Sequence, residues 1–207
     1  MCARCKLHEV VEQSELCQTC LDDDYNKYRV AHEVARIIPA RYQHAQMEAL
    51  PSELSEILLA LGTGRGAYLH GSVGFGKTFA MYAYVRFCIE QRFSVYVCSY
   101  DELCINIRAS FNDDSIDDEG TLINKCVAAD VLCLDDVGVS KRNEESEFST
   151  RILRTILNKR YNDMSRTIIT SNKSLVDLEF VFDERIVSRI RGCCVSVLMN
   201  GKDKRLL

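Results

Sequence analysis

Short apolar runs alternate with amphipathic stretches through most of the chain, and this alternation predicts the secondary structure. Mostly apolar runs bounded by polar or glycine-containing segments are typical of buried strands. We expect strands at Ala67–His70, Ser94–Cys98, Val131–Leu134, Thr167–Thr170 and Cys194–Met199. Between them, apolar positions three and four residues apart predict helices near Thr78–Gln91, Asp101–Phe111, Gly120–Ala128 and Glu144–Tyr161. Strands that alternate with helices indicate an α/β fold with one five-stranded parallel sheet.

Two further helices are predicted before this alternating region. Apolar and aromatic residues at three- and four-residue steps predict a helix over about Leu21–Ile38, which three successive aspartates favour at its start. A second helix, about Ser52–Leu61, begins with the capping signal SELSE and stops at glycines. Because Pro39 ends the first helix, we divide the chain there into an N-terminal module, residues 1–38, and a main domain, residues 39–207.

Composition excludes several classes of protein. The chain has 207 residues, 47% of them hydrophobic, which is enough for a single core and excludes disorder throughout. The longest run without a charged residue, Gly66–Gly76, is far too short to span a membrane, and the first residues contain no apolar signal segment. We therefore expect a cytoplasmic protein with no membrane partner. The net charge of −4 indicates no general basic field for nucleic acid, although local basic patches remain compatible with it.

Cysteine is frequent, with 11 residues, and four of them lie near the N-terminus in the pattern C-x2-C-x11-C-x2-C. Cys2 with Cys5, and Cys17 with Cys20, can each direct two thiolates at one ion, which predicts a structural zinc site. His8 is a spare candidate ligand. The alternatives are four reduced thiols or a redox pair, but no strand precedes the motif as a thioredoxin-like site requires. Because so short a segment has almost no core, zinc would supply its folding free energy.

The motif GSVGFGKT, residues 71–78, carries the clearest chemistry. It follows a predicted strand and opens a predicted helix, which is the context of a phosphate-binding P-loop rather than of a chance glycine turn. Glycines let the loop curl so that its N–H groups converge on a phosphate, while Lys77 meets the β- and γ-phosphates and Thr78 binds Mg²⁺. The predicted nucleotide contacts are Gly71, Ser72, Val73, Gly74, Phe75, Gly76, Lys77, Thr78 and Phe79.

Two later strands end in polar residues that suit the same reaction. The segment VLCLDDVG ends in Asp135, which would hold Mg²⁺, and Asp136, which would orient or deprotonate the attacking water. An Asx turn would explain one aspartate but not the pair. The strand TIITSN ends in Asn172, which we expect to sense the γ-phosphate, with a turn-forming asparagine as the alternative. Leu175 stands where a guanine-binding NKxD motif requires Asp, which disfavours a GTPase.

The segment DERIVSRIRG places Arg185 and Arg189 four residues apart, on one face of a helix. An arginine at the rim of such a domain typically completes a neighbouring subunit's site and stabilises charge on the transferring phosphoryl group. The alternative is a surface salt bridge to Asp183 or Glu184.

With these motifs in this order, the chain resembles the DnaC/IstB-like branch of AAA+ ATPases over roughly residues 37–207. The segments that carry the resemblance are IIPARYQHAQMEAL, GSVGFGKT, VLCLDDVG, TIITSN, DERIVSRI and the final GKDKR. The resemblance implies an αβα AAA+ core without a C-terminal lid, and ATP with Mg²⁺ as cofactors. It also implies roles that match by motif: Lys77 and Thr78 as Walker A, Asp135 and Asp136 as Walker B, Asn172 as sensor 1, Arg189 as arginine finger, and Arg205 as a late arginine near the phosphates.

That family includes bacterial and phage loaders of the replicative helicase. The resemblance therefore implies an ATP-dependent loader that forms a ring or spiral homo-oligomer, binds single-stranded DNA and engages a DnaB-type helicase. The four-cysteine module is similar to the zinc-bearing, helicase-binding region of DnaI-type loaders. The segment Tyr100–Cys126 would help to line the DNA channel, with Arg108 and Lys141–Arg142 as candidate phosphate contacts or as plain solvated charge.

Two other functions stay open from the sequence. One is an IstB-like ATPase that assists a DNA transposase on the same fold. The other is a nucleotide-dependent zinc binding module that never hydrolyses ATP. Aspartate at position 136, where many AAA+ proteins carry the longer glutamate, keeps this second alternative open.

Overall fold

The structure is a computed structural model that describes residues 1–11, 14–111, 117–138 and 146–200. The chain divides into two compact units, an N-terminal unit, Met1–Gln43, and a C-terminal unit, His44–Leu207. The sequence analysis divides the chain before Pro39, and the division between the two compact units falls a few residues later, after Gln43. None of the helices in the described ranges is long and apolar enough to cross a membrane.

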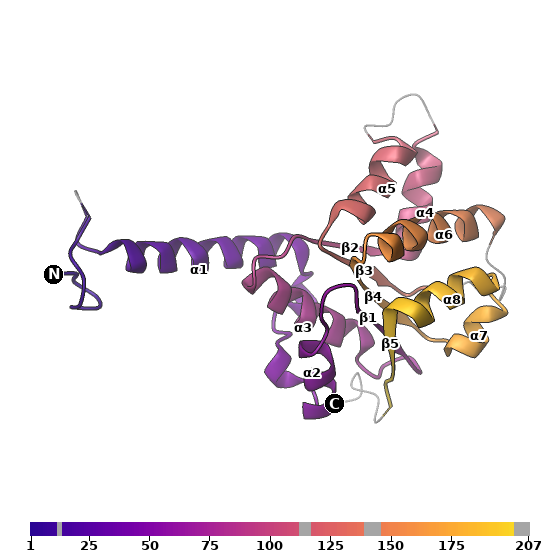
Figure 1. Cartoon of the computed structure of the whole chain (residues 1–207), viewed down its shortest axis with the longest axis horizontal. Coiled ribbons are helices and arrows are strands. Elements are labelled where there is room, and N and C mark those ends of the chain that lie inside the picture. Colours follow the sequence, from indigo (N-terminus) through magenta and orange to yellow (C-terminus); the bar gives the residue numbers. More distant parts are fainter. Residues whose placement is uncertain (12–13, 112–116, 139–145, 201–207) are drawn as a thin grey trace. The chain divides into compact units, whose positions relative to one another are not determined.

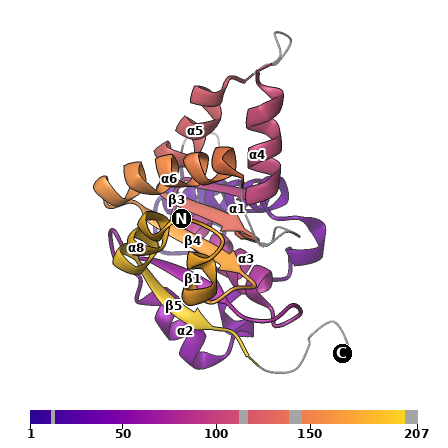
Figure 2. The same ribbon diagram turned by 90° about the vertical axis from the view of Figure 1, so that its right-hand side faces the viewer.

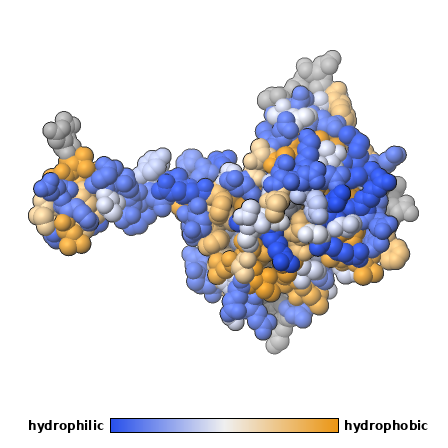
Figure 3. Space-filling model, viewed as in Figure 1, coloured by the Kyte–Doolittle hydropathy of each residue, from blue (hydrophilic) through white to orange (hydrophobic). Residues whose placement is uncertain are grey.

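The N-terminal unit consists of a cysteine-bearing loop followed by one long helix, α1, Gln18–Ile37 (Figure 1). The helix begins at Gln18 rather than at the predicted Leu21, because Cys17 is its N-cap residue. The second C-x2-C pair therefore forms the first turn, and the three aspartates lie beyond it. Only Cys20 and Val34 of α1 are buried, and most of the surface of the helix is hydrophilic (Figure 3).

Short elements flank the division between the units. The 3-10 helix η1, Ala40–Tyr42, ends the N-terminal unit, while η2, Met47–Ala49, and α2, Ser52–Leu59, open the C-terminal unit. The predicted serine cap of α2 is wrong. Pro51 occupies the N-cap position, and no side chain caps this end, because Ser52 is already the first helical residue.

The core of the C-terminal unit is a five-stranded, fully parallel sheet, which confirms the predicted fold class. Its strands are β1 Gly66–His70, β2 Val95–Ser99, β3 Val131–Asp135, β4 Arg166–Ser171 and β5 Cys194–Leu198. The strand order is β2-β3-β4-β1-β5. Since β4 lies between β3 and β1, the end of β4 lies between the strand ends that lead into the two predicted Walker motifs.

Helices cover both faces of the sheet and complete the predicted three layers (Figures 1 and 2). On one face α3, Lys77–Glu90, packs against β2, β3 and β4. On the other face, the helices are α4 Tyr100–Ala109, α5 Glu119–Ala128, α6 Glu147–Asn162, α7 Leu175–Glu179 and α8 Glu184–Cys193. Their apolar side chains form one cluster with Leu132, Leu134 and Ile169 of the sheet. Because both faces are covered, β3 is apolar from Val131 to Leu134, which is why the sequence marks it clearly, whereas β4 also carries buried hydroxyl groups.

Candidate functional site

The P-loop connects β1 to α3 and depends on glycine for its path. Gly71, Gly74 and Gly76 have φ angles of 139°, 88° and 85°, which residues with a side chain rarely adopt. At Gly71, a Cβ atom would also lie 2.2 Å from the carbonyl oxygen of Met199, next to β5. Position 71 therefore requires glycine, both for its backbone conformation and for the space beside Met199. A turn of this kind at a helix N-terminus is a binding site for anions.

Lys77 is almost completely buried and folds back onto its own loop. Its Nζ atom donates hydrogen bonds to the carbonyl oxygens of Gly71, at 2.8 Å, and Ser72, at 2.9 Å. Charged phosphate oxygens are stronger acceptors for an ammonium group than neutral carbonyls. The phosphates of a bound nucleotide would therefore compete with these two carbonyl oxygens for the ammonium group of Lys77. Phe79 follows Thr78 on α3, and the centre of its ring lies 5.5 Å from the centre of the His44 ring.

The two predicted Mg²⁺-binding residues come together from separate elements. Thr78 Oγ1, on α3, donates to the Oδ1 atom of Asp135, at the end of β3, at 3.2 Å. Burial raises the pKa of Asp135 above its usual range, and the nearby charge of Asp136 adds to this effect. A cation beside this carboxylate would offset the cost of burying its charge, and hydroxyl and carboxylate oxygens are the ligands that Mg²⁺ prefers. The residues therefore fit a Mg²⁺–nucleotide site.

Thr170, on β4, contacts both residues of the carboxylate pair. Its Oγ1 atom donates to Asp135 Oδ1, at 2.5 Å, and accepts a hydrogen bond from the backbone N–H of Asp136, at 2.9 Å. Asp136 itself has an exposed side chain and a left-handed backbone, with φ of 57°. The sequence analysis missed Thr170. Its signal is a hydroxyl near the carboxyl end of an apolar strand that neighbours the Walker B strand.

Asn172, the predicted sensor, follows the end of β4 by one residue and is half-buried. It lines a cavity of about 360 Å³ together with Lys173, Asp177, Phe180 and Val181. Within the described ranges its side chain has no hydrogen-bond partner. The structure thus places Asn172 beside the site, whereas Thr170 makes the contact with the carboxylates.

The two candidate finger arginines differ in their surroundings on α8. Arg189 is half-buried, its Nε donates to Asn158 Oδ1 at 3.0 Å, and its guanidinium lies 4.6 Å from the centre of the Tyr161 ring. Arg185 is exposed and makes no ion pair or hydrogen bond with any residue that the structure describes. Among the described residues, neither arginine forms the alternative salt bridge to Asp183 or Glu184, and Asp183 instead caps α8 and pairs with Arg154 of α6.

One surface of the C-terminal unit combines aromatic and basic side chains. Arg108 on α4 and Arg151 on α6 lie 4.9 Å and 5.4 Å from the centre of the Phe148 ring, and Phe111 meets that ring edge-on. Phe111 is 62% exposed. We call these four residues the Phe148 cluster. The other predicted basic residues, Lys141 with Arg142 and Arg205, lie outside the described residues.

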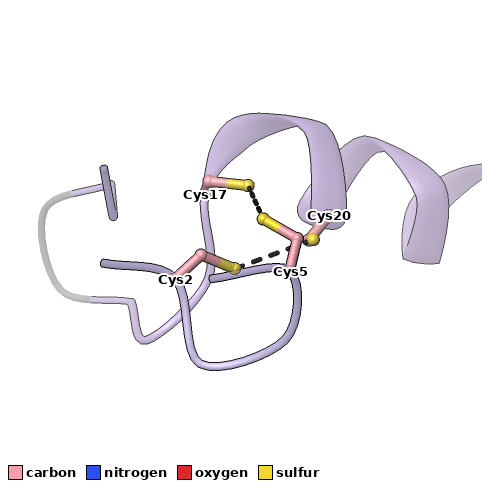
Figure 4. Close-up of side chains that lie close together, drawn as sticks. All are labelled: Cys2, Cys5, Cys17 and Cys20. Carbon is pink, nitrogen blue, oxygen red and sulfur yellow. Dashed lines mark hydrogen bonds between the residues drawn. The ribbon is translucent and has the colours of Figure 1, made fainter. Parts of the chain in front are cut away.

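The four predicted zinc ligands gather at the start of α1 (Figure 4). The Sγ atoms of Cys2, Cys5, Cys17 and Cys20 all lie within 4.8 Å of one another. The Cys2–Cys20 and Cys5–Cys17 sulfurs are each 3.7 Å apart. Sulfurs placed tetrahedrally at about 2.3 Å from zinc are about 3.8 Å apart. The four-cysteine cluster therefore fits a structural zinc ion.

The surroundings of the cluster favour ionisation of the Cys5 thiol and oppose that of the Cys20 thiol. His8 Nδ1 lies 3.6 Å from Cys5 Sγ and 3.9 Å from Cys17 Sγ, so its ring contacts the sulfurs. The backbone N–H of Leu7, with the His8 ring, lowers the pKa of Cys5 to about 5, whereas burial raises that of Cys20 to about 12. A divalent cation would supply the charge that lets all four thiols ionise together.

The parallel sheet, the glycine loop that opens α3 and the carboxylates at the end of β3 together define a P-loop ATP-binding protein of the AAA+ type. The chain belongs to the family of IstB-like ATP binding proteins, whose model matches residues 59–206. The family predicted from the motifs is therefore confirmed.

Curated relatives are named as helicase loaders. The chain is 25% identical over 156 residues to the replicative helicase loader DnaI of Bacillus subtilis (strain 168), covering 70% of this chain and 49% of that protein. It is 24% identical over 177 residues to the replicative helicase loader DnaC of Buchnera aphidicola subsp. Baizongia pistaciae (strain Bp), covering 86% and 65%. The chain thus spans about half to two thirds of the length of these relatives. A crystal structure of the DnaC helicase loader shares the fold, with a TM-score of 0.67 at 21% identity, covering 78% of this chain and 100% of that one.

Proposed function

We propose that this chain is an ATP-dependent loader of a replicative, DnaB-type helicase and works in the cytoplasm. The observation that carries the proposal is the assembled site, in which Thr78 meets Asp135 beneath a P-loop that holds Lys77. This site lies in a fold shared with a solved helicase loader, and the curated relatives carry the same description. ATP hydrolysis, helicase contact and assembly are all parts of the proposal.

Each residue of the site has a separate task in the hydrolysis of ATP. Lys77 and the P-loop amides hold the phosphates, while Thr78 and Asp135 hold Mg²⁺, which neutralises charge on the phosphates when bound. Asp136 orients the attacking water and accepts its proton at a carboxylate oxygen. Asn172, the residue directly after β4, is proposed to help orient the same water.

A second copy of the chain completes the site in this proposal. Asn158 and Tyr161 hold Arg189 by its Nε atom and its face, and no described residue engages its two terminal nitrogens. A guanidinium fixed in this way loses little freedom when those nitrogens meet a phosphate. We therefore assign the finger to Arg189, acting on the neighbouring subunit, with Arg185 as the second candidate. A ring or an open spiral satisfies this head-to-tail contact.

We propose that the assembled subunits bind single-stranded DNA. The Phe148 cluster offers the exposed ring of Phe111 for base stacking beside the guanidinium of Arg108, which can meet a phosphate. Arg151 is already paired with Glu119, at 2.8 Å. This surface includes Arg108 and Phe111 from the region in which the sequence analysis expects the DNA channel. The zinc-bearing N-terminal unit is the proposed adaptor that contacts the helicase.

Affinity capture with purified candidate partners tests the proposed function. We expect the tagged chain to retain a hexameric replicative helicase in the presence of ATP, and the Lys77→Ala variant to retain much less. A transposase captured in place of the helicase would favour the second candidate, an IstB-like transposition ATPase, which the family match supports. Capture of neither protein, by a chain that binds ATP normally, would contradict the loader assignment.

A further inference from the structure

We infer that Thr170 is a positioning residue that sets both carboxylates of the ATPase site through one hydroxyl group. The inference deepens the proposed function and rests on it, because it assigns to Thr170 the alignment of the Mg²⁺ ligand and of the residue that orients water. The segment TIITSN contains this residue, but the sequence analysis gives it no role.

The contact lies where the backbone pairing of the sheet stops. The pairing of β3 with β4 ends at Leu134 and Ile169, one position before the carboxylates. Beyond that position, the two segments are joined through Thr170, whose Oγ1 bonds Asp135 and Asp136 and whose carbonyl oxygen accepts the N–H of Val137, at 2.9 Å. Ser171 Oγ also donates a hydrogen bond to the carbonyl oxygen of Val137, at 2.7 Å. Two neighbouring residues of β4 therefore hold the turn, and Thr170 is the one of them that contacts the two acidic residues.

The chemistry of the hydroxyl fixes the direction of both bonds. A hydroxyl has one hydrogen to donate and two lone pairs that accept, whereas a backbone N–H can only donate. Oγ1 therefore accepts a hydrogen bond from the backbone N–H of Asp136 and donates its single hydrogen to the carboxylate of Asp135. Since Thr170 is fully buried, no bulk water can replace the hydroxyl.

Losing this hydroxyl would release both acidic residues at once. Asp135 would be free to turn away from Thr78, which weakens the Mg²⁺ site. The left-handed backbone of Asp136, with φ of 57°, would lose the acceptor of its N–H group and could relax to a commoner conformation. Both changes misplace groups that must be aligned for the chemical step, and neither removes a contact to ATP itself.

The same strand offers a matched control. Thr167, near the other end of β4, is also buried, and its Oγ1 accepts a hydrogen bond from Arg160 Nε at 3.0 Å. Replacing either threonine with valine keeps the shape and removes one buried hydroxyl from the strand. Only Thr170 touches the carboxylates, so only its replacement is expected to change the catalytic properties of the folded protein.

The test compares Thr170→Val, Thr170→Ser and Thr167→Val. At saturating Mg²⁺, we expect Thr170→Val to bind ATP within about threefold of wild type and to release phosphate on the order of 10²-fold more slowly. It should also need several-fold more Mg²⁺ for half-maximal ATP binding. Thr170→Ser should restore both properties, and Thr167→Val should leave both unchanged per folded molecule while lowering the unfolding midpoint.

The outcomes separate this inference from the proposed function. Equal phosphate release and equal Mg²⁺ dependence in the two valine variants would overturn the role of Thr170. A wild-type chain that binds ATP without releasing phosphate would contradict the proposed hydrolysis. In that case the Mg²⁺ dependence of ATP binding still decides on Thr170, because an unchanged value in Thr170→Val would overturn the inference. If Thr170→Val does not fold, Thr170→Cys keeps a small side chain with a poor donor and gives the same comparison.

Discussion

The buried clusters of the two units of this chain differ in composition and in size. In the described part of the N-terminal unit, the buried cluster at the start of α1 consists of Cys2, Cys17 and Cys20, with Cys5 and Leu16 packed against it. In the C-terminal unit, an apolar cluster spreads continuously from the sheet across the helices of one face. Burial of apolar surface can fold the second unit, whereas the first buries little apolar surface around a cysteine cluster that fits a zinc ion, so we predict that it folds on metal ligation. The comparison predicts that removal of metal unfolds the N-terminal unit and leaves the C-terminal unit folded on its apolar core.

The largest expected effect is the loss of the whole N-terminal fold in Cys17→Ser. Removing one of four ligands should release the zinc and unfold the cysteine loop, while ATP affinity stays near wild type, because the P-loop belongs to the other unit. Elemental analysis, hydrogen exchange and ATP titration measure the three quantities. Cys88→Ala, a buried cysteine of α3, is the control that should keep one zinc ion per chain. Wild-type protein that contains no metal when purified without chelator would refute the zinc site.

Within the C-terminal unit, Lys77→Ala and Asp136→Asn should separate nucleotide binding from turnover. Lys77 meets the phosphates in the ground state, so its loss should abolish measurable ATP binding. Asp136→Asn should bind ATP and fail to turn it over, because an amide cannot accept the proton. Asparagine also tolerates the left-handed backbone of this position, so the turn should persist. Equal losses of ATP affinity in the two variants would contradict these roles.

Replacing Arg189 with alanine should slow hydrolysis by on the order of 10³-fold while ATP affinity is retained. Mixing this variant with Lys77→Ala should restore part of the activity, because one chain keeps an intact P-loop and the other keeps an intact finger. Arg185→Ala is the comparison on the same face of α8. Wild-type turnover by Arg189→Ala, at protein concentrations that permit assembly, would move the finger to Arg185.

The smallest predicted effect concerns the stability of the C-terminal unit alone. Arg160 on α6 is 1% exposed, and its guanidinium donates to the carbonyl oxygens of Cys126, Val127 and Ala129 at 2.8–3.0 Å. Arg160→Met should lower the free energy of unfolding by on the order of 3 kcal/mol, because several buried carbonyls lose their donor. Urea denaturation measures the loss, and zinc content should not change.

A control on the same helix sharpens this prediction. Arg154 pairs with Asp183 at 2.7 Å, but its side chain is partly exposed, so Arg154→Met should cost less than about 1 kcal/mol. Similar losses of unfolding free energy in the two variants would contradict the prediction that the buried hydrogen bonds of Arg160 stabilise the unit more than an exposed ion pair does.

The features that could be predicted from the sequence depend on neighbours along the chain. The P-loop needs glycines and a lysine at fixed spacing, and the buried strands are continuous apolar runs, so both are visible locally. The two C-x2-C turns are equally local, and the structure brings their sulfurs together. The cap of α2 shows the limit of such patterns, since the predicted signal is present but Pro51 occupies the capping position.

The features that the sequence analysis missed depend on contacts between distant segments. Thr170 reaches Asp135 because β4 pairs with β3 in a particular register, which no local pattern specifies. The hydrogen bond from Arg189 to Asn158 likewise depends on how α6 packs against α8. These tertiary contacts place the groups that we propose as catalytic, so the sequence indicates the chemistry of the candidate site more completely than its geometry.

Phosphate release by the wild-type chain with single-stranded DNA is the measurement that tests the central claim most directly. The account predicts Mg²⁺-dependent turnover of ATP whose rate per subunit rises with protein concentration, because Arg189 of one copy acts on the next. The result that would contradict it is stoichiometric binding of ATP with no phosphate released at any protein concentration, with or without DNA. The chain would then be a nucleotide-dependent zinc binding module rather than an ATPase.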